Sequence, residues 1–156
     1  MADRSNNKTK QGGPRSAARL AAVQALYQLE RSDEPNSKVV IEEYRSHRLG
    51  AEIEGDQYVD ADAVLFADVT EGGWERKEEW DAQIAPCLNA EWSLDRLESI
   101  IRAIFRAGAY ELSARPDVPT KVIINEYLDI AHAFYDRTET SFVNGVLDKL
   151  AKALRT

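Results

Sequence analysis

The sequence predicts an all-α protein, a compact helical domain of about seven helices with no sheet, and three observations support this fold class. Apolar residues recur with the helical period throughout the chain, and no segment alternates in the manner of a half-exposed strand. The C-terminal segment is the clearest case, because its apolar side chains fall at positions 142, 143, 146, 147, 150, 151 and 154, the stripe of an amphipathic helix. The chain has 156 residues, of which 44% are hydrophobic, and this is enough to bury a core without disulfides or metals.

Four helices are expected in the N-terminal half, spanning about residues 17–31, 38–49, 60–70 and 74–88. Ser16 is the expected N-cap of the first helix, because its side chain can accept a hydrogen bond from an unpaired backbone N–H. Residues 50–55 form a break. We expect Gly72-Gly73 to end the third helix, and Pro86 to stop or kink the fourth.

Three further helices are expected in the C-terminal half, spanning about residues 94–114, 119–134 and 141–154. Ser93 can cap the first of them. Gly108 lies in the middle of this helix, where it costs about 1 kcal/mol relative to Ala, and it predicts a close crossing with another helix. The helix at 119–134 is apolar over so much of its circumference that we expect neighbours on more than one side.

The helices group into one domain, residues 15–156, with an N-terminal subdomain of about 15–90 packed on a C-terminal subdomain of about 91–156. Residues 1–14 are polar and include Gly and Pro, so we predict a disordered tail. Residues 1–19 carry five basic side chains against Asp3 alone, although the whole chain has a net charge of −7. Basic arms often bind nucleic acid, because each phosphate they neutralise releases counterions; a solubilising tail is the alternative interpretation.

Arg15 and Arg19 are the most informative cations of this region. They lie four residues apart, so they share one face near the start of the first helix. Positive charge at a helix N-terminus opposes the helix dipole and is mildly unfavourable. Neither side chain has an evident role within the fold, and contact with an external anion would relieve the unfavourable placement.

The composition argues against several classes of protein. His47, His132 and Cys87 are the only residues of their types, too few for a familiar Cys/His zinc site, and neither Gly12-Gly13 nor Gly72-Gly73 is followed by the Lys-Ser/Thr of a phosphate-binding loop. We therefore expect no enzyme, no cofactor and no metal. No stretch reaches the roughly 20 apolar residues that span a bilayer, and a single cysteine fits a reducing cytoplasm.

Four blocks of the sequence resemble, in the same order, the NusB family of bacterial antitermination factors. The most specific is Phe142-Val-Asn-Gly-Val-Leu-Asp-Lys149, and Asn125-Glu126 and Tyr110-Glu-Leu112 match at suitable distances. The blocks span residues 15–27, 92–97, 100–112 and, together, 119–134 and 142–149. The family is all-helical, with two helical subdomains packed together, which agrees with the helices expected above.

The resemblance implies RNA binding without catalysis. Proteins of this family pair with the ribosomal protein NusE, bind the boxA element of nascent RNA, and join other Nus factors on RNA polymerase to suppress termination, notably in ribosomal RNA operons. Carried over to this sequence, the candidate RNA-binding residues are Arg15, Arg19, Tyr27, Phe142 and Asn144. Arginine can bind phosphate and aromatic rings can stack on unpaired bases. Each aromatic also has a structural alternative, since Tyr27 and Phe142 can both belong to the core.

Two departures from the family pattern keep alternatives open. Residues 16–18 are Ser-Ala-Ala where the family often has a tighter arginine run, and Ile101 stands where many members carry a glutamate, in a region associated with NusE. One alternative is a protein-interaction adaptor with little RNA affinity, and another is self-association as a homodimer through the apolar Ile101. A third, an RNA methyltransferase with a NusB-like domain, would need a cofactor-binding domain for which no residues remain.

Overall fold

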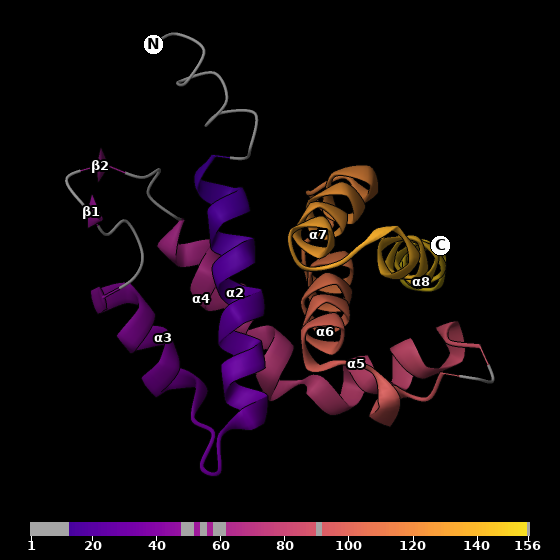
Figure 1. Ribbon diagram of the computed structural model, residues 1–156, viewed down its shortest axis with the longest axis horizontal. Helices are drawn as coiled ribbons and strands as arrows, with labels where there is room; N and C mark the ends of the chain where they lie inside the picture. Colours follow the sequence, from indigo (N-terminus) through magenta and orange to yellow (C-terminus); the bar gives the residue numbers. More distant parts are fainter. Residues whose placement is uncertain (1–12, 48–51, 54–55, 58–61, 90–91, 156) are drawn as a thin grey trace, which may run out of the picture.

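The computed structural model describes residues 13–47, 52–53, 56–57, 62–89 and 92–155 (Figure 1). Within these ranges the chain forms seven α-helices: α2 (Pro14–Arg31), α3 (Ser37–His47), α4 (Ala63–Glu75), α5 (Lys77–Ile84), α6 (Ser99–Ala114), α7 (Thr120–Phe134) and α8 (Arg137–Leu154). Two 3-10 turns, η1 (Ala85–Cys87) and η2 (Leu94–Arg96), follow α5 and precede α6. The strands β1 (Glu52–Ile53) and β2 (Asp56–Gln57) pair antiparallel over only two residues each. The all-α prediction is confirmed. The predicted tail lies almost wholly outside the described residues.

Helix α6 lies at the centre of the molecule. It packs against α2 and α4 on one side, α7 and α8 on the other, and α5 at one end (Figure 1). Its side chains Ile104 and Phe105 are fully buried, as are Trp80 of α5 and Phe66 of α4. Helix α7 contacts α2, α6 and α8, as its broad apolar arc predicts. The division into subdomains near residue 90 remains a prediction.

Several helix ends differ from the sequence-based expectation. Helix α2 begins at Pro14 with Gly13 as N-cap, and Ser16 instead donates a hydrogen bond to Glu126 Oε1 at 2.6 Å. The N-terminus of α2 therefore uses the fixed backbone of proline rather than a side-chain cap. Helix α8 likewise begins at Arg137, four residues before the predicted start.

Glycines 72 and 73 were expected to end α4, but the helix runs through them to Glu75. A methyl group on Gly72 would overlap the ring of Tyr110, and one on Gly73 would lie 3.2 Å from Leu26 Cδ1. These glycines allow α4 to approach α6 and α2 closely, which is why they occur inside the helix. The Gly108 crossing is confirmed in the same way, since a Cβ there would lie 3.1 Å from Leu147 Cδ2.

The segment expected as one helix from residue 94 is two elements. Leu97 and Glu98 are extended, with ψ of 142° and 146°, so η2 ends before α6 starts. Arg102 holds this bend, because its Nη1 donates to the carbonyl oxygens of Leu94 and Leu97 at 2.7 and 2.8 Å. Earlier in the chain, α5 ends at Ile84 and Pro86 lies in η1, as expected for a proline that stops a helix.

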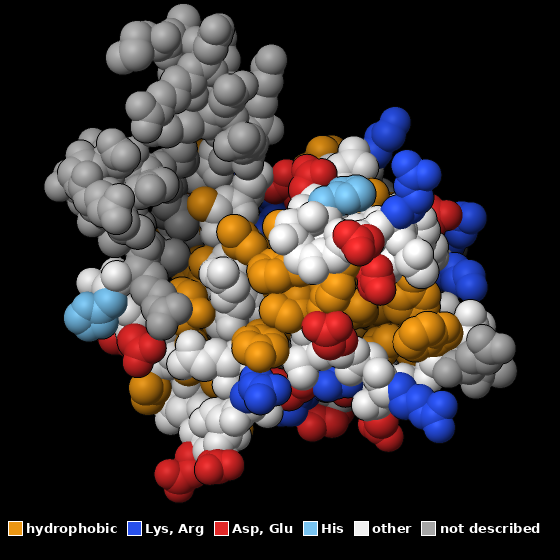
Figure 2. Space-filling view, viewed as in Figure 1, with side chains coloured by type: hydrophobic (Ala, Val, Ile, Leu, Met, Phe, Trp, Pro, Cys, Tyr) orange, Lys and Arg blue, Asp and Glu red, His pale blue; other side chains and the backbone are white. Residues whose placement is uncertain are grey.

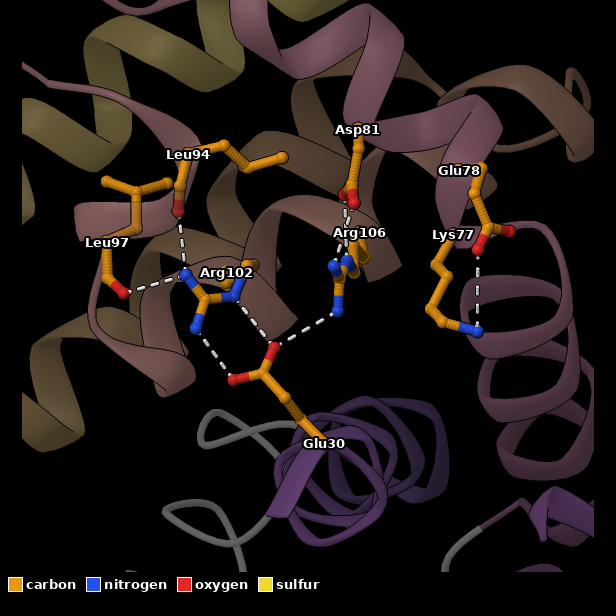
Figure 3. A network of polar contacts seen from close by, with 8 residues as sticks. All are labelled: Glu30, Lys77, Glu78, Asp81, Leu94, Leu97, Arg102 and Arg106. Carbon is orange, nitrogen blue, oxygen red and sulfur yellow. Dashed lines mark hydrogen bonds and ion pairs between the residues drawn. The ribbon is translucent and has the colours of Figure 1, made fainter. Parts of the chain in front are cut away.

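A polar network joins α6 to the end of α2 and to α5 (Figure 3). Arg102 binds both carboxylate oxygens of Glu30 at 2.7 Å, and Arg106 binds both carboxylate oxygens of Asp81 at 2.8 Å. Arg106 also reaches Glu30 at 3.1 Å, so the two arginines share this acid. The hydrogen bonds from Arg102 lower the pKa of Glu30 below its ordinary value, although partial burial acts in the opposite direction.

Replacing Gly72 should disturb the contact between α4 and α6. We expect Gly72→Ala to lower the free energy of unfolding by about 1–3 kcal/mol, because the methyl group must displace the Tyr110 ring. Urea denaturation would measure this. In a Tyr110→Ala background the same substitution should lose its cost, and an equal cost in both backgrounds would contradict the steric explanation.

The Glu30 ion pairs predict a pH dependence of stability. We expect Glu30→Gln to lower the free energy of unfolding by about 2 kcal/mol at neutral pH, since two arginines lose a charged partner. Because the folded pKa of Glu30 is lowered, its stabilisation is complete above the ordinary pKa of 4.5 and is lost as pH falls through the folded pKa. Denaturation at several pH values should show the difference between wild type and variant shrinking below pH 4.5, whereas the exposed control Glu43→Gln should change little at any pH.

Candidate nucleic-acid interface

Arg19 is buried, which corrects the expectation that it has no role in the fold. Its side chain is 3% exposed, and Nε and Nη2 bind the two carboxylate oxygens of Glu111 at 2.7 and 3.0 Å. Nη1 binds Glu126 Oε1 at 2.9 Å. The guanidinium thus joins α2 to α6 and α7, and it has no free face to offer to a phosphate.

The ionisable groups of this cluster shift the pKa values of Arg19 and Tyr127. Burial alone would lower the pKa of the Arg19 guanidinium, but its hydrogen bonds and charge interaction with Glu111 leave that pKa raised. The hydroxyl of Tyr127 donates to Glu111 Oε2 at 2.5 Å, and burial, followed by the Glu111 charge, raises the pKa of this phenol well above its ordinary value. The cluster therefore brings together the guanidinium of Arg19, the carboxyl groups of Glu111 and Glu126, and the phenol of Tyr127.

Arg15 lies one turn earlier on α2 and is exposed. It forms no ion pair with any residue that the structure describes, unlike Arg19. The Arg19 cluster holds α2, the helix that also carries Arg15, against α6 and α7. Sequence reasoning grouped the two arginines because they share a helix face, but only Arg15 is presented to solvent.

Tyr27 lies twelve residues farther along α2 and is half-buried, with the guanidinium of Arg31 5.4 Å from its ring centre. A helix rises about 1.5 Å per residue, so Arg15 and Tyr27 are roughly 18 Å apart. They can contact one RNA strand only at different nucleotides.

Phe142 lies on α8 beside a groove of about 380 Å³ between η2, α6 and α8. Its ring centre is 5.3 Å from that of Trp92, which is 44% exposed, and 6.0 Å from that of the buried Phe105. Ile101 is nearly buried in the groove wall. Phe142 thus has one side on the core and one on the groove, and its role in RNA binding remains a prediction. Asn144 is exposed on the same helix.

Tyr135 is the C-cap of α7 and is half-buried. Burial raises the pKa of its phenol, and the charges of Glu98 and Glu139 in the groove raise it further. Figure 2 shows hydrophobic side chains gathered on the face between α2 and α8.

Comparison with known proteins identifies the family. The sequence model described as the NusB family matches residues 16–152. The transcription antitermination protein NusB of Bradyrhizobium sp. (strain ORS 278) is 47% identical over 149 residues, which cover 96% of this chain and 88% of that protein. The chain belongs to the NusB family. The NusB of Nitrobacter hamburgensis is 46% identical over 155 residues, 99% of this chain and 96% of that protein.

Solved structures of the NusB family share the fold. NusB from T. maritima superposes with a TM-score of 0.71 at 34% identity, covering 89% of this chain and 91% of that one. A chain in the crystal structure of antitermination factors NusB and NusE in complex with double-stranded RNA gives a TM-score of 0.64 at 26% identity, covering 88% of this chain and 96% of that one. The resemblance and the fold class are thus confirmed, and the protein is a transcription antitermination factor, not an enzyme.

The NusB-family blocks contain the partners of the buried arginine. Glu111 lies in Tyr110-Glu-Leu112 and Glu126 in Asn125-Glu126, and both bind Arg19. In the sequence, both acids match the family pattern, but the pattern assigned them no role. A buried cation needs acidic partners, and the family blocks contain both of them. Glu111 and Glu126 lie 92 and 107 residues from Arg19 in the sequence, so local patterns do not reveal the pairing.

No group of His, Cys, Asp and Glu side chains among the described residues is arranged to hold a metal ion. No described helix is long and apolar enough to cross a membrane.

Removing one of the two arginines should affect stability very differently from removing the other. We expect Arg19→Met to lower the free energy of unfolding by about 3–5 kcal/mol, because it leaves the buried Glu111 carboxylate unpaired. Arg15→Met should change it by less than about 0.5 kcal/mol. Chemical denaturation of both variants tests this, and similar stabilities would show that the Arg19 ion pair does not support the fold.

Proposed function

We propose that this protein binds boxA RNA together with the ribosomal protein NusE, and that the complex joins other Nus factors on RNA polymerase to suppress termination, notably in ribosomal RNA operons. The observation that carries the proposal is the shared fold with a NusB chain that was crystallised with NusE and RNA. Membership of the NusB family over nearly the whole chain supports it independently.

The exposed side chains support distinct roles in this proposal. Arg15 would neutralise a phosphate, Tyr27 and Phe142 would stack on unpaired bases, and the exposed Asn144 would hydrogen-bond to a base edge or the sugar. Arg19 supports the fold and does not contact RNA, because its guanidinium is hydrogen-bonded to Glu111 and Glu126. The RNA surface is thus mainly aromatic, with few charges.

The adaptor alternative rests on a specific observation. Only one of the two expected arginines is exposed, and the groove beside Phe142 has the apolar Ile101 in its wall. Such a groove suits an apolar side chain of NusE or of a second copy of this chain, and either would leave RNA with little direct contact.

RNA binding across a salt series separates these proposals. We expect a labelled boxA RNA to bind more tightly than a scrambled RNA when NusE is present. Arg15→Met should weaken binding and reduce the slope of log K against log salt by about 0.7, the contribution of one phosphate contact on a single strand. Lys38→Met, which removes an exposed cation from α3, is the matched control and should leave both quantities unchanged.

The other outcomes are equally informative. If NusE binds while neither RNA adds affinity at any salt concentration, the protein is an adaptor. Light scattering on the free protein distinguishes a monomer from a homodimer that buries the groove.

A further inference from the structure

Arg102 holds the connection between η2 and α6 as well as its acidic partner. Its Nη1 donates to the carbonyl oxygens of Leu94 and Leu97 at 2.7 and 2.8 Å. Its backbone N–H donates to the carbonyl oxygen of Glu98 at 3.0 Å. Its Nε and Nη2 bind the two carboxylate oxygens of Glu30 at 2.7 Å, which fixes the orientation of the guanidinium (Figure 3).

Packing does little to hold η2 in place. The turn is three residues long, contains no buried residue and has no side-chain hydrogen bond at its N-cap. The next two residues, Leu97 and Glu98, are extended and separate the turn from α6. Backbone carbonyls at such a bend need donors, and hydrogen bonds from a charged guanidinium are of the strong kind. We therefore expect the position of η2 to depend on Arg102.

The segment that Arg102 holds is one wall of the groove beside Phe142. Arg96, Leu97 and Glu98 line the groove on this side. Glu139 lines it from α8, on the opposite side. A shift of η2 would therefore change the width of the groove and the separation of its two acidic side chains.

The charges of the groove favour a protein partner over RNA. Two carboxylates, Glu98 and Glu139, line it against one cation, Arg96. A phosphate entering the groove would be repelled by both acids. A lysine or arginine side chain of a protein would be attracted to them, and its aliphatic stem could pack on the apolar Leu97 and Ile101.

We infer that Arg102 is a positioning residue for a protein partner, because it holds η2 so that the groove between Glu98 and Glu139 can receive a cationic side chain of that partner. Arg102 acts from within the fold, through the backbone of η2, and does not itself contact the partner. The inference rests on the proposed function, in which NusE is the protein partner, and it adds the residue that shapes the groove and the charge that the groove accepts.

Arg106 provides a matched control for Arg102. Both side chains lie on α6, bind Glu30 and are 11–14% exposed, but Arg106 binds Asp81 where Arg102 binds the carbonyls of η2. We expect Arg102→Met to weaken NusE binding in the absence of RNA by about tenfold, the effect of a groove that keeps its shape in about one molecule in ten. Arg106→Met should also lower stability but should leave the affinity for NusE unchanged.

Hydrogen exchange supplies a readout that a general loss of stability does not move. In Arg102→Met, the backbone N–H groups of Arg96 and Leu97, which are hydrogen-bonded within η2, should exchange faster than in wild type. The N–H of the buried Ile104 should stay protected in the same sample. In Arg106→Met, the exchange of η2 should match that of wild type.

Neutralising the two acids tests the chemistry of the partner. Glu98→Gln and Glu139→Gln should each weaken NusE binding by about two- to fivefold and reduce its dependence on salt, as expected for the loss of an exposed ion pair. Glu43→Gln on α3 is the control and should change neither quantity. If these substitutions strengthened boxA RNA binding and left NusE binding unchanged, the groove would hold RNA and the inference would be overturned.

The remaining outcomes separate this inference from the proposed function. If wild-type protein does not bind NusE, the proposed function fails. If wild type binds NusE, and Arg102→Met binds it as tightly as Arg106→Met does, the inference is overturned and the proposed function stands. If light scattering shows a wild-type dimer that Arg102→Met alone disrupts, with NusE binding unchanged, the groove belongs to a second copy of the chain and the inference is likewise overturned.

Discussion

The buried contact of Arg19 with Glu111 is the interaction on which the arrangement of this molecule depends. A fully buried carboxylate is tolerable only beside a cation, and the pair is held by two hydrogen bonds with Tyr127 as a third donor. The cluster joins the N-terminal helix α2 to α6 and α7, which lie some 90 residues later in the chain. It therefore fixes how the exposed start of α2, with Arg15, is oriented relative to the C-terminal helices.

Most of the arginines on α6 and at the start of α2 serve the fold. Arg102 and Arg106 bind Glu30 and Asp81 (Figure 3). Arg19 binds Glu111, so the charges of all three arginines are paired inside the molecule. The chain as a whole has a net charge of −7, which does not favour RNA binding. An aromatic surface is the physical alternative, since stacking does not require net positive charge. In the proposed function, Tyr27 and Phe142 provide the rings for it.

Glycines show how the same residue type serves opposite purposes. Gly72, Gly73 and Gly108 remove side chains where helices must approach one another, and each lies against a neighbour that would clash or crowd. Gly145 removes a side chain where nothing lies nearby. The first kind is explained by packing within the chain, whereas packing does not explain the second.

The sequence by itself determined the helices and the family, because helical period and motif blocks are local patterns that need no knowledge of long-range contacts. It also identified Gly108 as a crossing point and Pro86 as a stop. It could not separate Arg15 from Arg19, since both share a helix face, nor foresee that α4 continues through Gly72-Gly73. Those outcomes were decided by tertiary structure alone: Glu111, Glu126 and Tyr110 come from distant parts of the chain, and only folding brings their carboxylates and ring against α2 and α4.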